Sequence, residues 1–105
     1  ARKRMMAQVP KADVVITNPT HLAVAIQYRP ESMAAPVVVA KGADFIAEQI
    51  RKIALENDVP LIENKPLAQV LYKIVKVNSM VPESLYRAVA VLAFVYEQKK
   101  VKIFG

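Results

Sequence analysis

Two short apolar runs, separated by only four residues, constrain how this chain can fold. The first run is Asp13 to Thr17 and the second is Leu22 to Tyr28. In both runs consecutive residues are apolar, and not only every second residue. This pattern is typical of strands buried on both faces of a sheet. Because the segment between them is so short, we expect the two strands to be near neighbours.

Two more strands and a long loop are predicted further along the chain. Val37 to Ala40 and Leu61 to Glu63 predict the third and fourth strands. The segment Arg29 to Pro36 contains two prolines and precedes the third strand, so we expect a loop there.

Three helices complete the pattern. Gly42 to Asn57 carries an apolar stripe at helical spacing, and Leu67 to Ile74 follows the i, i+3, i+4, i+7 spacing of an amphipathic helix. The last helix is expected from Pro82 to about Gln98 and is apolar almost all round, so it is either deeply buried or docks on a partner. This order predicts a single compact α/β domain in which helices surround one mixed four-stranded sheet.

The composition excludes many kinds of catalytic site. The chain has 105 residues, no cysteine, one histidine (His21) and two glycines (Gly42 and Gly105). Disulfides, thiolate metal sites and a cysteine nucleophile are therefore excluded, and a P-loop or dinucleotide fingerprint cannot be built. We expect neither a bound metal nor another cofactor.

The net charge of +6 is concentrated at the start of the chain. Arg2, Lys3, Arg4 and Lys11 lie in the first eleven residues, and the other 11 Lys and Arg nearly balance the 9 Asp and Glu. Residues 1–11 are predicted to be a basic linker, or a helix that needs support from outside. Basic arms suit nucleic acid or an anionic membrane surface, although the few aromatic residues do not interleave with the cations as single-strand binding requires.

The reactive side chains of this sequence are concentrated in one motif, Asn18-Pro19-Thr20-His21. Pro19 has no N–H, so the usual attack of the following backbone nitrogen on an Asn side chain is closed. The remaining route has the Asn18 side-chain nitrogen attack its own backbone carbonyl, closing a succinimide and releasing the Pro19 nitrogen. A fold accelerates this step by holding the nitrogen at attack distance, by straining the bond, and by placing donors at the carbonyl oxygen.

Two neighbours of the Asn-Pro bond are candidates for a supporting role. We expect His21 to move protons or to fix the turn by hydrogen bonds, and Thr20 to do the latter. Asp13 is predicted to be a solvated residue that opens a strand rather than a partner of His21. A plain turn stays open as the alternative, because Asn-Pro is a common turn opener.

The motif and its surroundings resemble the FlhB/YscU family, the export-switch proteins of flagellar and injectisome type III secretion. Besides the four motif residues, the resemblance rests on the segments Asn18 to Tyr28, Val38 to Gly42, Val59 to Tyr72 and Val81 to Val95. It therefore covers nearly all of the chain after the arm. The sequences of the AKG and ENKPLAQVLY segments are more similar to the flagellar branch of the family than to the virulence branch.

The resemblance implies a bacterial inner-membrane protein whose transmembrane region is missing here. Residues 1–11 would be the linker from that region, and residues 12–105 a cytoplasmic domain that cuts itself between Asn18 and Pro19. The pieces 12–18 and 19–105 would stay associated. The cut would permit export to change from rod and hook substrates to filament-type substrates, as a single-turnover maturation and not as enzyme turnover.

The resemblance also implies partners. These are the export gate and ATPase complex of the flagellar export apparatus, a hook-length control protein, export substrates with their chaperones, and the membrane through the missing region, with no nucleic acid. A small apolar surface at Ala34, Ala35, Pro36 and Ala90 is a candidate contact for partners. The alternative is a non-catalytic α/β adaptor that binds a partner protein or nucleic acid through its basic arm.

Overall fold

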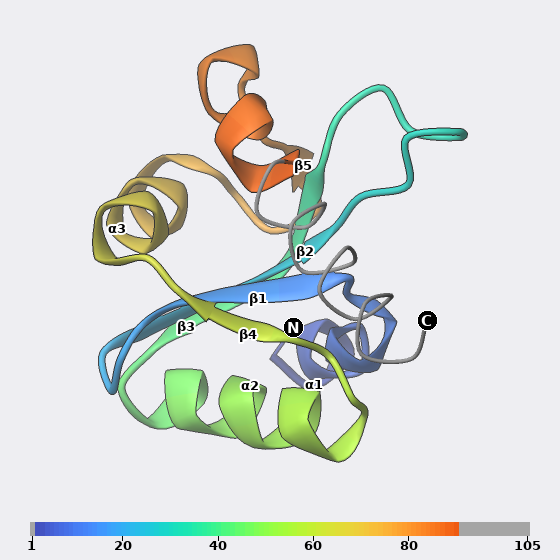
Figure 1. The fold of residues 1–105 in the computed structure, drawn as a ribbon. Coiled ribbons are helices and arrows are strands. Elements are labelled where there is room, and N and C mark those ends of the chain that lie inside the picture. The colour runs from blue at the N-terminus through green and yellow to red at the C-terminus, as the bar shows by residue number, and fades with distance from the viewer. Residues whose placement is uncertain (1, 91–105) are drawn as a thin grey trace, which may run out of the picture.

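A five-stranded mixed sheet forms the centre of the computed structural model, which describes residues 2–90 (Figure 1). The strands are β1 (Val14–Asn18), β2 (Leu22–Gln27), β3 (Val37–Ala43), β4 (Leu61–Glu63) and β5 (Ser79–Met80). Their order across the sheet is β4-β1-β2-β3-β5. β1 and β4 are parallel, and the other neighbouring strands are antiparallel.

The α/β class and the mixed sheet are confirmed, but the prediction of four strands is wrong. The fifth strand, β5, has two residues, and it pairs with β3 through Val37 to Met80 and Val38 to Ser79. A strand of two residues is too short to show alternation, so only its tertiary pairing reveals it. β3 also extends three residues beyond Ala40, because its end pairs with the start of β2.

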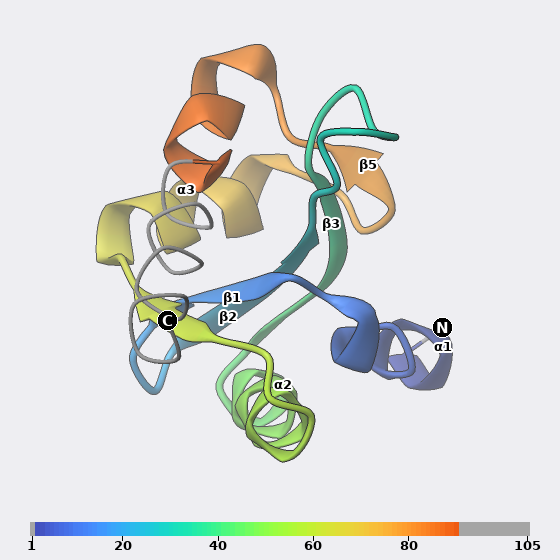
Figure 2. The ribbon, with the colours of Figure 1, turned by 45° about the vertical axis from the view of Figure 1, so that its right-hand side comes forward.

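Helices cover both faces of the sheet (Figures 1 and 2). α2 (Phe45–Glu56) covers one face, and α3 (Lys65–Ile74) covers the other together with a helix that begins at residue 83. The cluster of buried residues on the α2 side comprises Val9, Ala12, Val15, Ala23, Ala25, Val39, Ala40, Ala47, Ile50, Ala54 and Val59. The cluster on the α3 side comprises Val14, Ile16, Val24, Ile26, Val38, Leu67, Ala68, Leu71, Val75, Val81 and Val89.

Local chemistry explains where α3 begins and how it is held. The Asn64 side chain accepts a hydrogen bond from the Leu67 N–H at 3.1 Å, which caps the helix. Leu67 and Leu71 are buried and Tyr72 packs against the same core, as expected of core residues. The Lys41 ammonium donates to the Tyr72 carbonyl at 2.7 Å and lies 5.2 Å from the centre of its ring, joining α3 to β3.

The basic arm lies against the domain. It forms α1 (Arg2–Met6) and a short 3-10 helix (Val9–Lys11), and its two methionines pack against the core cluster on the α2 side. The domain itself therefore supports this basic helix. The sequence alone predicts either a linker or a helix supported from outside. Within residues 2–90, no helix is long and apolar enough to cross a membrane.

The last predicted helix is described only in part. Residues 83–90 are helical, and Val89 is buried in the α3-side core. The predicted continuation to Gln98 lies outside the described residues.

Gly42 is required where β3 meets α2. A Cβ at this position would lie 2.2 Å from Cγ2 of Ile46 and 2.7 Å from its Cβ. A β-branched side chain in the first turn of a helix cannot move far aside. The glycine therefore allows the close approach that places the start of α2 at the end of β3.

We expect Gly42→Ala to lower the free energy of unfolding by about 1–3 kcal/mol, because it overpacks this contact. Urea unfolding of the purified domain measures the change. Ala43→Ser, at the neighbouring half-buried position, is the control and is expected to change stability by less than about 0.5 kcal/mol. Equal stability of Gly42→Ala and the parent chain would contradict the packing account.

Candidate functional site

The motif forms the tight turn of the β1–β2 hairpin. Asn18 is the last residue of β1 and pairs with Leu22, so Pro19, Thr20 and His21 make the connection. The His21 backbone N–H donates to the Asn18 carbonyl oxygen at 3.0 Å and closes the turn. Proline at the second position and a positive φ at the third match a type II turn.

Thr20 holds a strained conformation in this turn. Its φ is 68°, in the left-handed region that a type II turn requires at this position. Glycine usually occupies that position, and a β-branched residue there is a conformational outlier. Such a residue stores on the order of 1–3 kcal/mol, held by the surrounding structure.

The structure places the four motif residues in two environments. Asn18 is buried, Pro19 is half-buried, and Thr20 and His21 are exposed. The alternation of the strand puts Asn18 on the same face as Ile16, toward α3. The side chain with the predicted chemistry is therefore held at the end of the sheet, and the strained turn lies in solvent.

The backbone before the Asn-Pro bond is fixed from both sides. Thr17 pairs with Ala23 of β2 and with Glu63 of β4. Its carbonyl also accepts a hydrogen bond from the Asn64 N–H at 2.9 Å, and its hydroxyl lies 3.5 Å from the Ile62 carbonyl. Asn18 therefore follows a rigid segment, which suits a reaction that depends on position.

Asp44, and not Asp13, is the acidic residue beside His21. One carboxylate oxygen of Asp44 lies 3.6 Å from Nδ1 of His21, and the Asp44 N–H donates to the His21 carbonyl at 2.8 Å. Asp13 is half-buried and accepts a hydrogen bond from the Tyr28 N–H at 2.7 Å. Asp13 directly precedes β1 and is not the partner of His21, as predicted, but it is half-buried and not fully solvated. Asp44 was not predicted from the sequence, because it is distant from His21 along the chain.

The predicted partner surface is only partly exposed. Ala34 is exposed, but Ala35 and Pro36 are buried, and the Pro36 carbonyl accepts a hydrogen bond from the Val81 N–H at 2.8 Å. Ala90 is half-buried. Pairing of the segment after β5 with this loop buries Ala35 and Pro36, so the four residues do not share one open surface in this structure. Binding of a partner at Ala34 stays a prediction.

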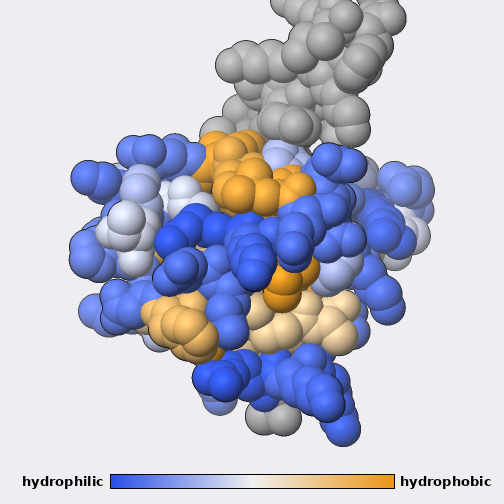
Figure 3. Space-filling view, turned by 90° about the horizontal axis from the view of Figure 1, so that it is seen from below, coloured by the Kyte–Doolittle hydropathy of each residue, from blue (hydrophilic) through white to orange (hydrophobic). Residues whose placement is uncertain are grey.

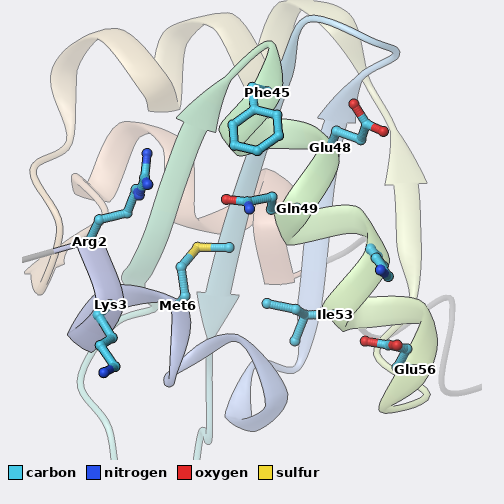
Figure 4. Close-up of a pocket in the computed structure, with 9 residues that line it drawn as sticks. Arg2, Lys3, Met6, Phe45, Glu48, Gln49, Ile53 and Glu56 are labelled. Atoms are coloured by element: carbon cyan, nitrogen blue, oxygen red, sulfur yellow. The ribbon is translucent and has the colours of Figure 1, made fainter.

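A groove of about 580 Å³ separates α1 from α2 (Figure 4). Met6, Phe45 and Ile53 supply its apolar side chains, between basic residues of α1 and acidic residues of α2. Figure 3 views this side of the molecule and shows small apolar areas separated by hydrophilic side chains. This groove was not predicted, since it joins segments that lie about forty residues apart.

Comparison with known proteins shows which family shares this α/β domain and its Asn-Pro motif. The family model described as "FlhB HrpN YscU SpaS Family" matches residues 1–95. The chain belongs to this family.

Similar curated proteins include flagellar biosynthetic proteins. The chain is 54% identical over 101 residues to the flagellar biosynthetic protein FlhB of Bacillus subtilis (strain 168), a match that covers 95% of this chain. It is 52% identical over 106 residues to that of Escherichia coli (strain K12), with 100% of this chain covered. In both cases the match spans 28% of the relative, so this chain covers little more than a quarter of the length of each of these relatives.

Solved structures agree with this assignment. The cytoplasmic domain of FlhB from Shewanella putrefaciens superposes with a TM-score of 0.87 at 43% identity, covering 97% of this chain and 79% of that one. A mutated EscU C-terminal domain superposes with a TM-score of 0.82 at 33% identity, covering 87% and 91%. The chain therefore has the fold of these domains.

Substituting Thr20 tests the strain in the turn. In an Asn18→Ala background, we expect Thr20→Gly to raise the free energy of unfolding by about 1 kcal/mol, because glycine adopts positive φ without a steric cost. Thr20→Val keeps the branched Cβ and should leave stability close to that of the background. Denaturant unfolding gives both values, and a loss of stability in Thr20→Gly would contradict the strained turn.

Proposed function

We propose that this domain cuts its own chain between Asn18 and Pro19, and that the cut permits a change in the substrates of a flagellar type III export apparatus. The observation that carries the proposal is the hydrogen bond from the His21 N–H to the Asn18 carbonyl oxygen, at 3.0 Å. That oxygen is attached to the carbonyl carbon whose bond to the Pro19 nitrogen would break. The turn therefore aims a donor at the atom where negative charge develops.

The reaction balances without any cofactor. The Asn18 side-chain nitrogen attacks the Asn18 carbonyl carbon, and the negative charge that forms on the oxygen is stabilised by the His21 N–H. The C–N bond to Pro19 then breaks, and a proton from the attacking amide passes to the Pro19 nitrogen, which leaves as a secondary amine. The first piece ends in a succinimide, which water later opens.

Strain in the turn favours the forward step. The left-handed conformation of Thr20 adjoins Pro19 and can relax once the bond is cut. A carboxamide nitrogen is a weak nucleophile, so the fold must supply the acceleration through position and strain. Each chain reacts once, so the domain is not a turnover enzyme.

The change that follows the cut is expected to be local. β1 stays paired with β2 and β4, and its buried side chains belong to both cores. Only the turn loses its covalent connection, so its new ends can present a different surface. We propose that this altered surface, without refolding, is what the export machinery recognises.

Membership of the family supports a proposal about the place of the domain in the cell. We propose that it lies on the cytoplasmic side of the bacterial inner membrane, joined through the basic arm to the membrane part of the longer protein. Its partners would be the export gate and ATPase complex, a hook-length control protein, and export substrates with their chaperones. The shift from rod and hook to filament-type substrates would depend on contacts with these proteins.

Mass spectrometry after denaturation tests the cleavage. We expect the parent chain to give two masses that correspond to residues 1–18 and 19–105, and Asn18→Ala to give one intact chain. Asn57→Ala, which removes an exposed asparagine far from the turn, is the matched control and should cleave like the parent. Intact parent chains after prolonged incubation would overturn the proposal and favour the adaptor alternative.

Association of the two pieces tests the local nature of the change. We expect the cleaved protein to elute from a sizing column as one species, and to give the same circular dichroism spectrum as Asn18→Ala. The pieces should separate only in denaturant, since strand pairing and core burial hold them together. Separation under native conditions, or a large spectral difference, would contradict a local switch.

A further inference from the structure

We propose that Asp44 is a positioning residue for His21 in the self-cleavage, and this inference rests on the function proposed above. It would hold the imidazole with its proton on Nδ1, leaving Nε2 as the nitrogen free to accept a proton. His21 immediately precedes β2 and Asp44 immediately follows β3, so both lie at the end of these two strands where α2 begins (Figure 1).

The backbones of His21 and Asp44 are joined independently of their side chains. The Asp44 N–H donates to the His21 carbonyl at 2.8 Å, and the next residue pair, Leu22 and Ala43, is in register between β2 and β3. Ordering two side chains usually offsets most of the benefit of an exposed ion pair. Here the backbone is already ordered, so less entropy is lost when the side chains meet.

The Asp44 carboxylate does not make the capping hydrogen bond that is usual for an aspartate at the start of a helix. Asp44 is the N-cap residue of α2, yet its side chain makes no capping hydrogen bond. Aspartate at an N-cap normally accepts from a backbone N–H of the first turn. Its φ of 50° and ψ of −111° are far from usual cap values, and its carboxylate lies beside His21 instead.

The chemistry of the two groups selects one form of the imidazole. A carboxylate can only accept hydrogen bonds, and the ring nitrogen that lies beside it, at 3.6 Å, is Nδ1. A neutral histidine beside it is therefore favoured with its proton on Nδ1. Nε2 then carries the lone pair that would take the proton released from the Asn18 amide and pass it to the Pro19 nitrogen as that nitrogen leaves.

The size of the effect is limited by exposure. The side chains of His21 and Asp44 are 70% and 81% exposed. Water screens their attraction, so orientation of the ring is the larger contribution. We expect loss of the carboxylate to slow cleavage about fivefold and not to abolish it.

Asp44→Asn tests the inference, with Asp58→Asn as its matched control. Asp58 is also exposed and also has a positive φ, at 58°, but it lies at the other end of α2. Cleavage is followed by denaturing electrophoresis from the time of synthesis in a cell-free translation reaction. We expect Asp44→Asn to cleave about fivefold more slowly than the parent, and Asp58→Asn to cleave at the parent rate.

The protonation of His21 is measured separately, in uncleaved Asn18→Ala protein. Nitrogen-15 NMR shifts of the single histidine report which ring nitrogen carries the proton. We expect protonated Nδ1 with Asp44 present, and a shift toward protonated Nε2 in the Asn18→Ala, Asp44→Asn protein. This measurement needs no cleavage, so it tests the Asp44–His21 contact even if the proposed function fails.

The combined outcomes decide the inference. Slower cleavage together with a changed histidine form supports it. An unchanged rate overturns the role in cleavage, and a slower rate with an unchanged histidine form shows a merely structural effect and also overturns it. Failure of the parent chain to cleave at all overturns the proposed function instead.

Discussion

The pairing of β1 with a strand on each side is the interaction on which the rest of the structure depends. β2 joins it antiparallel and β4 joins it parallel, and its side chains alternate between the two cores. Because β1 is held on both edges and both faces, Asn18 has a fixed position at its end. A strand held in this way would also keep the domain assembled after the proposed cut.

The turn after β1 concentrates the features that a slow intramolecular reaction needs. In the proposed cleavage, the attacking group and the carbonyl would belong to the same residue, Asn18. The His21 N–H faces the Asn18 carbonyl oxygen, and Thr20 stores strain beside the bond between Asn18 and Pro19. Each effect alone is modest, but position, charge stabilisation and strain act on the same step. The same geometry in a loose peptide would exist only for a small fraction of the time.

Contacts between segments that are distant along the chain determine where α1, α2 and Asp44 lie. Gly42 lets α2 approach β3, which brings Asp44 beside His21. α1 packs its methionines against the core on the α2 side, and the groove between α1 and α2 results from that packing. The basic arm thus belongs to the surface of the domain, beside α2.

The sequence alone determined the α/β class, the four principal strands, the described helices α2 and α3, and the motif at residues 18–21, because hydrophobic periodicity and proline chemistry are local properties. Only the tertiary structure decided that β5 exists, that Ala35 and Pro36 are buried, and that Asp44 neighbours His21. These features depend on register and on close approach between segments far apart in the chain. Hydrophobic periodicity carries no information about which distant segments come close together, so only the packing of the folded chain determines these contacts.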